Sequence, residues 1–180
     1  MLGRHEKSIK ILDSLVLHNE IEAGMEELKL FTDGSVNPQA MVGYGVYLLV
    51  SDINTSIDCL EKDLKTKRFT DTSSTKLELQ TLLWALSDIG TRGQHITVYT
   101  DSQNTMGLFR RREGFEKKSY LTSKGKLIAN HELYKEFYRL TDKIECSFIK
   151  VKGHKQAAQR DKIDHVFALV DKGSRDALRA

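Results

Sequence analysis

The sequence predicts an α/β domain built on a five-stranded mixed sheet, with three antiparallel and two parallel strands flanked by helices. Two observations lead to this fold class. Short β-branched and aromatic runs are interspersed with longer segments in which leucines recur at helical spacing. The first three strand-like runs follow one another closely, as in an antiparallel meander. Each of the last two is preceded by a helical segment, which is how parallel strands are joined.

The first half of the chain contains the predicted meander. Residues 28–32 alternate as a strand that runs into Asp33, and residues 43–50 form an apolar, aromatic second strand. Residues 53–60 are predicted as the third strand, because the turn at Asp52 is short enough for a hairpin.

The second half of the chain alternates helices with strands. Ser and Thr at residues 72–75 supply N-cap chemistry for a leucine-rich helix that Gly90 ends, with Ser74 as the candidate N-cap. The next strand, residues 95–100, ends at Asp101. The remaining predicted elements are a helix over 102–112, an exposed basic excursion over 113–126, a helix over 132–140, a strand over 144–150 and a helix over 161–178.

Composition excludes several classes of protein. The chain has 180 residues, of which 39% are hydrophobic and 29% charged, so it does not have the composition of a disordered chain. No apolar run approaches the ~18 residues of a membrane span, and Asp13 interrupts the only stretch that resembles a signal peptide. Cys59 and Cys146 are too few for a disulfide framework, and we expect both to be buried in strands. We therefore expect a cytoplasmic protein.

Positive charge is concentrated in two parts of the chain, although the net charge is only +3. Residues 110–126 carry seven Lys and Arg against two Glu, and residues 143–162 carry six against two acidic residues. Two basic blocks on a nearly neutral chain favour a polyanionic partner such as a nucleic acid. A solvated basic surface without a ligand explains the charge equally well.

Four carboxylates are candidates for a shared site. Asp33 and Asp101 each follow an apolar strand, and sites in open α/β sheets form at the ends of neighbouring strands. Glu78 and Asp164 lie in the opening turns of two helices that can pack over those strand ends. Taken singly, an Asp before Gly or Ser is more often a turn former. Four converging carboxylates would need divalent cations, and an all-oxygen set suits Mg²⁺ or Mn²⁺ in two-metal phosphodiester hydrolysis.

Five motifs together resemble one known family. The segments FTDGS, TKLELQTLLWAL, ITVYTDSQ, VKGH and RDKIDHVFALV resemble ribonuclease H of type 1, over about residues 28–176. The resemblance implies a ribonuclease H-like fold. It also implies Mg²⁺-dependent hydrolysis, with two ions, of the RNA strand of RNA–DNA hybrids, leaving 5′-phosphate and 3′-hydroxyl ends. His154 matches a catalytic His of a flexible loop that assists proton transfer or product departure. The family's catalytic metal ligands match Asp33, Glu78, Asp101 and Asp164.

The resemblance also implies contacts with the substrate. Ser74 stands where the family often has an Asn that contacts the minor groove, where 2′-hydroxyl groups are read, and Gln103 matches a residue that contacts the hybrid. Arg160 replaces a family Asn, a departure that concerns the His154 loop and not the metal site. The basic segment resembles the family region that grips the DNA strand. The expected substrate-binding residues are Ser35, Ser74, Gln103, Arg111, Arg112, Lys117, Lys118 and Lys152.

We expect residues 28–180 to form the ribonuclease H-like catalytic domain of a monomer. Residues 1–27 are expected to be a helical extension that packs against this domain or makes an oligomer contact. Two other functions remain open. A non-catalytic nucleic-acid-binding domain would lack one of the carboxylates, whereas all four are present here. A DNA nuclease of the same superfamily, such as an integrase or resolvase, is disfavoured by the KGH motif and the basic segment.

Overall fold

The computed structural model describes residues 27–90, 95–151 and 160–180, so the predicted N-terminal extension, Lys152 and His154 lie outside the described residues. The elements in chain order are β1 (Leu28–Asn37), β2 (Val42–Val50), α2 (Ile57–Leu60), η1 (Glu61–Asp63), β3 (Lys65–Thr70), α3 (Ser74–Ile89), β4 (Ile96–Thr100), α4 (Gln103–Met106), α5 (Leu108–Lys117), α6 (His131–Thr141), β5 (Cys146–Lys150) and α7 (Lys162–Arg179).

The five strands form one mixed sheet in the order β3-β2-β1-β4-β5. β1, β2 and β3 pair antiparallel to one another, whereas β4 runs parallel to both β1 and β5. The predicted fold class, with three antiparallel and two parallel strands flanked by helices, is therefore confirmed.

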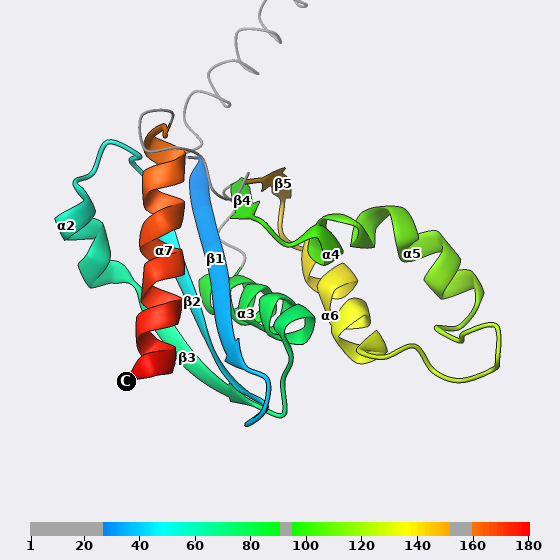
Figure 1. The fold of residues 1–180 in the computed structure, drawn as a ribbon. Coiled ribbons are helices and arrows are strands. Elements are labelled where there is room, and N and C mark those ends of the chain that lie inside the picture. The colour runs from blue at the N-terminus through cyan, green and yellow to red at the C-terminus, as the bar shows by residue number, and fades with distance from the viewer. Residues whose placement is uncertain (1–26, 91–94, 152–159) are drawn as a thin grey trace, which may run out of the picture.

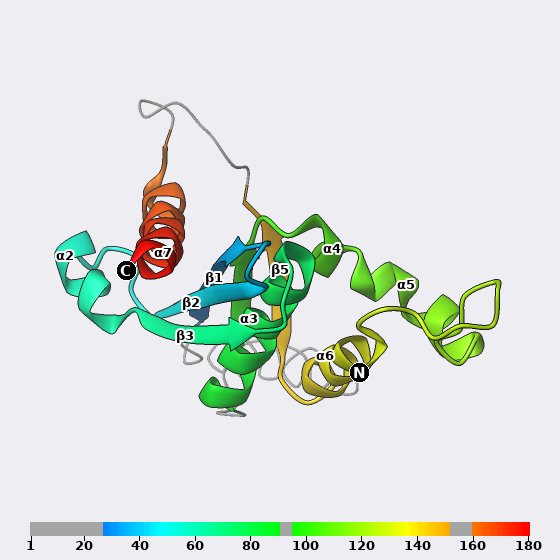
Figure 2. The ribbon, with the colours of Figure 1, turned by 60° about the horizontal axis from the view of Figure 1, so that its bottom comes forward.

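The helices lie on both faces of the sheet. Figures 1 and 2 show α7 along one face and α3 with α6 on the other. Successive side chains of a strand point to opposite faces, and this alternation divides the core in two. Leu30 and Val98 pack with α3 and α6, whereas Phe31 and Tyr99 pack with α7. Residues of β1 and β4 that share a face with Phe31 and Tyr99 are therefore directed toward α7.

The third strand was predicted in the wrong place. Residues 53–60 contain the helix α2, and the strand that pairs with β2 is β3. Ile53, Ile57 and Leu60 recur at helical spacing, and Leu60 is buried in the cluster that includes α7. β3 has the sequence KTKRFT and only one partly buried residue, because it is an edge strand with both faces largely exposed. Such an edge carries charged residues that discourage pairing with another chain, so it lacks apolar alternation.

Three smaller predictions also differ from the structure. β1 continues through Asp33 to Asn37 because β2 extends alongside it, so Asp33 lies within the strand and not at its end. The predicted helix over 102–112 is divided at Gly107 into α4 and α5, and α5 takes in the first part of the predicted excursion. Cys59 is exposed on α2, and Cys146 is only half-buried in β5. Among the described residues, no helix is long and apolar enough to cross a membrane.

Candidate active site

The strand register places Asp33 and Asp101 side by side. The last parallel pair of β1 and β4 is Phe31 with Tyr99, and each Asp lies two residues further along its strand. Neighbouring strands are about 4.8 Å apart, and residues two positions apart share a face of the sheet. The rings of Phe31 and Tyr99 stack with their centroids 4.8 Å apart, directly before the two carboxylates. Asp33 and Asp101 are therefore adjacent acids on the face covered by α7.

Glu78 reaches the same place from the opposite layer. It lies in the second turn of α3, whose N-cap is Ser73 and not the predicted Ser74. The hydroxyl of Ser102, the residue after Asp101, donates to Glu78 Oε2 at 2.6 Å and accepts from the backbone N–H of Thr105 at 3.2 Å. Ser102 is buried, so both of these bonds are shielded from water. One serine thus holds the α3 carboxylate beside the end of β4.

The charge of Asp101 disfavours the charged forms of both Asp33 and Glu78. Burial, followed by the charges of Asp101 and Asp171, raises the pKa of Asp33 to about 6. Burial and the charge of Asp101 likewise raise the pKa of Glu78. Within the described part of the chain, none of Asp33, Glu78 and Asp101 forms an ion pair with a Lys or Arg. The positive charge that would relieve this crowding is not supplied by a described side chain.

Asp164 lies at the start of α7, in the opening turn of the last helix as the sequence predicts. It is buried in the first turn of α7, where it forms a reciprocal capping box with Asp161. The Asp164 N–H donates to Asp161 Oδ1 at 2.9 Å, and the Asp161 N–H donates to Asp164 Oδ2 at 2.9 Å. Asp164 lines a cavity of about 380 Å³ together with Tyr99, Ile149, Lys150, Val151, Asp161 and Ile163. Asp33, Glu78 and Asp101 do not line that cavity.

The part of α7 that lies against Asp33 is two turns further along, at Asp171 and Ser174. The Ser174 hydroxyl, which is fully buried, donates to Asp33 Oδ2 at 2.5 Å, and the charge of Asp171 acts on the same carboxylate. The Asp171 carboxylate also accepts a bond from Arg175 Nη2 at 2.7 Å. The sequence analysis missed Asp171, because the ten-residue interval from His154 favoured Asp164.

Helix and strand geometry explain why Asp171 lies there. In Figure 1, β1 and α7 run in the same direction from the same end of the molecule. Asp33 lies five residues into β1, which is about 17 Å at the rise of a strand. A helix covers that distance in about eleven residues, which from the start of α7 reaches the segment between Asp171 and Ser174. Which residue of α7 lies opposite Asp33 thus depends on how the helix packs along β1.

The donor chemistry fits a hard divalent cation that keeps much of its own water. Asp33, Glu78 and Asp101 offer only carboxylate oxygens, which Mg²⁺ and Mn²⁺ prefer, and the raised pKa values of Asp33 and Glu78 indicate that positive charge would stabilise these two carboxylates. Among the described residues, no three His, Cys, Asp or Glu side chains are grouped closely enough to hold an ion by themselves. This agrees with the usual coordination of Mg²⁺, which binds one or two protein carboxylates together with waters and substrate phosphates.

The predicted substrate-binding residues near the acids fall into two groups. Ser35 lies two residues beyond Asp33 on the same face, and its hydroxyl is 2.9 Å from that of Ser174. Ser74 is the first residue of α3, and Gln103 is the first residue of α4. The side-chain oxygen of Gln103 accepts a hydrogen bond from Lys150 Nζ. Ser35 is thus part of the packing around Asp33, whereas Ser74 and Gln103 are exposed beside it.

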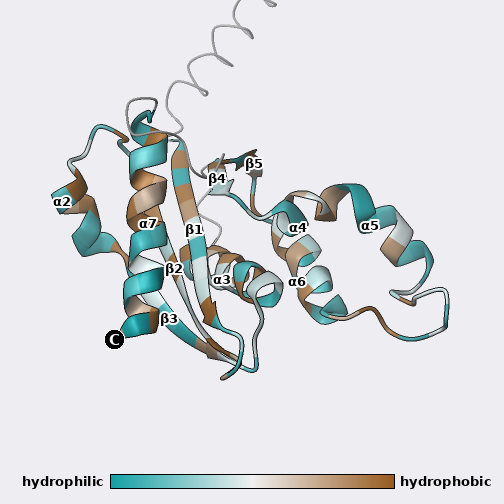
Figure 3. Ribbon diagram, viewed as in Figure 1, coloured by the Kyte–Doolittle hydropathy of each residue, from teal (hydrophilic) through white to brown (hydrophobic). Residues whose placement is uncertain are grey.

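The basic residues lie on a projection from the sheet that we call the basic arm, residues 108–127. It consists of α5 and a loop closed by a bridge between Leu121 and Leu127, and Figure 3 shows most of α5 as hydrophilic. Phe115 stacks on Tyr134 of α6 at 5.5 Å and anchors the arm. The predicted contacts Lys117 and Lys118 are exposed at the end of α5 and make no ion pair with a described residue. The other two, Arg111 and Arg112, are bonded within the protein.

Comparison with known proteins identifies the family. A family model described as RNase H matches residues 25–168, a segment that contains Asp33, Glu78, Asp101 and Asp164 and ends before Asp171. A protein named Ribonuclease H from Helicobacter acinonychis is 32% identical over 81% of this chain and 93% of its own length. Proteins of the same name from Syntrophomonas wolfei and Neorickettsia sennetsu are 28% and 26% identical, over 79% and 84% of this chain and 94% and 92% of their own. The chain therefore belongs to the RNase H family and is a ribonuclease H enzyme.

Proposed function

We propose that this enzyme hydrolyses the RNA strand of RNA–DNA hybrids with Mg²⁺, which Mn²⁺ can replace, and leaves 5′-phosphate and 3′-hydroxyl ends. One observation supports the chemistry above all. Carboxylates from β1, α3 and the end of β4 lie close together without a cationic partner among the described residues, and burial together with the charge of Asp101 raises the pKa values of Asp33 and Glu78. Such a group is costly to ionise unless a cation binds to it.

Asp33, Glu78 and Asp101 would hold the ions. Two bound cations would lower the pKa of an attacking water and stabilise the leaving oxygen of the phosphodiester. The protein's own contribution is to orient the carboxylates. The Ser174 hydroxyl fixes Asp33, and the Ser102 hydroxyl fixes Glu78. His154, which lies outside the described residues, would move a proton or help the product leave.

Asp164 and Asp171, which both lie on α7, are the two candidates for the fourth carboxylate of the site. Family resemblance and the interval from His154 favour Asp164, whereas proximity to Asp33 favours Asp171. Asp164 already has a structural role, because its carboxylate closes the capping box of α7. We infer that Asp171 is the fourth catalytic acid and that Asp164 stabilises the start of the helix.

The substrate would lie across the exposed residues beside the acids and along the basic arm. Ser74 would contact the minor groove, Gln103 would contact the hybrid beside the acids, and Lys117, Lys118 and Lys152 would contact backbone phosphates. The proposal includes a monomeric, cytoplasmic enzyme whose partner is the hybrid itself.

A single assay tests the proposed activity. An end-labelled RNA–DNA hybrid is compared with matched double-stranded RNA and matched double-stranded DNA, in each case with Mg²⁺ or with EDTA. We expect cleavage of the hybrid alone, only with the metal, and RNA products that carry a 3′-hydroxyl. Equal cleavage of double-stranded RNA, or cleavage of the hybrid in EDTA, would contradict the proposal.

A further inference from the structure

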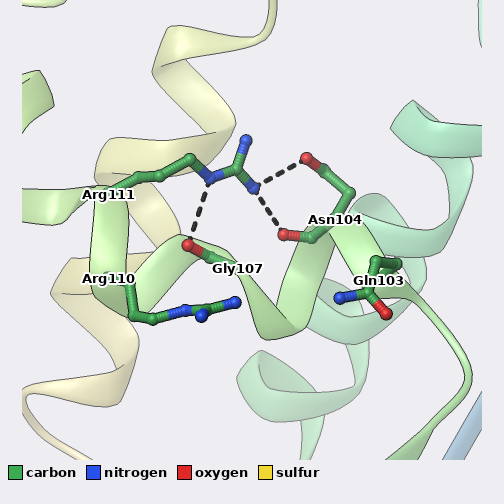
Figure 4. Close-up of a pocket in the computed structure, with 5 residues that line it drawn as sticks. All are labelled: Gln103, Asn104, Gly107, Arg110 and Arg111. Carbon is green, nitrogen blue, oxygen red and sulfur yellow. Dashed lines mark hydrogen bonds between the residues drawn. The ribbon is translucent and has the colours of Figure 1, made fainter.

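Three consecutive arginines at the start of the basic arm differ in what they contact. Arg111 fastens the turn between α4 and α5. Its Nε donates to the Gly107 carbonyl at 3.1 Å, and its Nη2 donates to the carbonyl and Oδ1 of Asn104 at 2.6 and 2.8 Å (Figure 4). Its guanidinium also lies 5.6 Å from the centre of the Phe115 ring. The charge of Arg111 is thus used to hold the arm to the rest of the domain.

Arg112 has a second structural role. Its guanidinium forms a two-pronged ion pair with Asp142, with distances of 2.6 and 2.7 Å, and bonds Glu116 at 2.8 Å. It also lies 5.0 Å from the centre of the Tyr138 ring of α6. Arg112 therefore ties α5 to α6, and its charge is already balanced.

Arg110 is the one of the three that makes no hydrogen bond or ion pair with a described residue. It is exposed in the first turn of α5, where the helix dipole disfavours a cation. A cationic side chain in an unfavourable position without an internal partner is explained if it binds an external anion.

Arg110 lines an open pocket whose wall carries no acidic residue. The pocket has a volume of about 460 Å³, and its lining residues are Gln103, Asn104, Gly107, Arg110 and Arg111. In Figure 4, the Arg110 guanidinium and the Gln103 amide point toward one another across the turn, and Arg111 lies on the other side of it. The pocket therefore has two guanidinium groups and no charge of the opposite sign.

The neutral residues of this pocket also offer donors. The Gln103 oxygen accepts from Lys150, which leaves the Gln103 NH₂ group to donate outward. The Asn104 oxygen is bonded by Arg111, and the Asn104 NH₂ group is buried without an acceptor in the described structure. Unused donors and positive charge together favour an oxyanion as the ligand.

We propose that this pocket binds one backbone phosphate of the substrate, with Arg110 as the charged contact and Gln103 as the amide donor. The proposal rests on the proposed function and deepens it, because Gln103 is two residues from Asp101 and the bound phosphate would fix the hybrid relative to the acids. Phosphate contacts position a nucleic acid without reading its sequence. The bound phosphate would thus determine which linkage of the RNA strand lies at the acids.

Binding without cleavage tests this proposal separately from the activity. The affinity of the full chain for a fluorescent RNA–DNA hybrid is measured in EDTA over a range of salt concentrations, for wild type, Arg110→Gln and Arg139→Gln. Arg139 is an equally exposed arginine on α6 that pairs with Glu136, so its variant is the matched control. We expect Arg110→Gln to weaken binding about three- to tenfold and to reduce the slope of log K against log[salt] by roughly 0.7–0.9, the loss of one phosphate contact.

The control should bind the hybrid as the wild type does. If Arg110→Gln matches the control in affinity and in salt slope, the pocket is not a phosphate site, even if the hybrid is cleaved normally with Mg²⁺. If Arg110→Gln shows the expected loss but the wild type cleaves nothing, the pocket is supported and the proposed activity fails.

Uncharged methylphosphonate linkages can identify which strand of the hybrid the pocket holds. Methylphosphonate linkages are placed one at a time along the RNA strand or the DNA strand, and binding by wild type and Arg110→Gln is compared. We expect one position at which the neutral linkage weakens the wild type but not the variant, and the strand that contains it is the strand held by the pocket. Equal sensitivity of both proteins at every position of both strands would overturn the proposal.

Discussion

The acidic edge of the sheet and the basic arm treat charge in opposite ways. At the acidic edge, which comprises Asp33, Glu78, Asp101 and Asp171, burial and like charge raise the pKa values of Asp33 and Glu78 toward the neutral form. In the arm, Asp142 and Glu116 raise the pKa of Arg112 and so stabilise its charged form. Among the described residues, Asp33, Glu78 and Asp101 have no such counter-charge, whereas Asp171 pairs with Arg175 at 2.7 Å. The difference indicates that the acidic edge is built to receive cations from outside, whereas the charges of Arg111 and Arg112 serve the structure of the arm.

The comparison also limits what a run of like charges in a sequence can show. Arg110, Arg111 and Arg112 are neighbours in the chain, yet only Arg110 is free of a described partner. Counting basic residues overestimates the number that can reach a nucleic acid. Arg111 is bonded to Asn104 of α4 and to the Gly107 carbonyl, whereas Arg112 is bonded to Asp142 at the end of α6 and to Glu116 of α5 itself.

Removing the charge at the centre of the acidic edge should have the largest effect. Asp101 lies beside both Asp33 and Glu78, so Asp101→Asn should lower kcat by about 10³-fold or more through loss of a metal ligand. The same change relieves repulsion, so the metal-free variant should melt at the same temperature as the wild type or higher. Single-turnover cleavage and thermal melting in EDTA measure the two effects.

Asp58→Asn, a change of an exposed acid on α2, is the control for that experiment and should alter neither quantity. A metal-free Asp101→Asn protein that melts at a lower temperature would show that Asp101 has a structural role instead.

The pH dependence of stability should reveal the repulsion at Asp33. Its pKa is about 6 in the folded protein and ordinarily near 3.8, so the folded state binds the extra proton between these values. Stability contributed by this group is therefore lost as pH rises from about 4 to about 6, by at most roughly 3 kcal/mol. Urea unfolding in EDTA measures the free energy of unfolding of the wild type and of Asp33→Asn at each pH. The difference in favour of Asp33→Asn should grow as pH rises across that range and should stay constant above it. A difference that is independent of pH would contradict the repulsion.

His154 should matter less than the acids. We expect His154→Ala to slow cleavage by about 10²-fold, because water can partly replace a group that moves a proton or assists product departure. Glu78→Gln should instead abolish cleavage, because no neighbouring group replaces its carboxylate. Single-turnover and steady-state rates in Mg²⁺ distinguish the chemical step from product release. Complete loss in both variants would assign His154 to the metal-binding group.

The smallest expected effect concerns the basic arm. Arg112→Ala removes the link between α5 and α6, so it should speed hydrogen exchange of the α5 amides. It should weaken hybrid binding less than Arg110→Gln does, since its charge is already balanced within the arm. Hydrogen exchange and binding in EDTA measure these changes. Equal losses of affinity in the two variants would mean that Arg112 also contacts the substrate.

The sequence was sufficient for four of the five strands, because these depend on local patterns, and the structure brings the predicted Asp33 and Glu78 near Asp101. The part of β1 before Asp33 and the whole of β4 are rich in buried apolar residues, so both are recognisable as short apolar runs. The edge strand β3 escaped prediction because exposed strands need no alternation, and residues 53–60 were misread because their apolar spacing is helical. Asp171 escaped for a different reason, since which turn of α7 meets Asp33 depends on how far the helix extends along β1.

The measurement that most directly tests this account compares Asp171→Asn with Asp164→Asn in cleavage of the hybrid with Mg²⁺. Each change removes one charge, and an Asn at 164 keeps an oxygen that can still accept from the Asp161 N–H of the capping box. We predict that Asp171→Asn loses activity to the level of Asp101→Asn, whereas Asp164→Asn cleaves at close to the wild-type rate. An active Asp171→Asn together with an inactive Asp164→Asn would contradict the assignment of the acidic edge made from the structure.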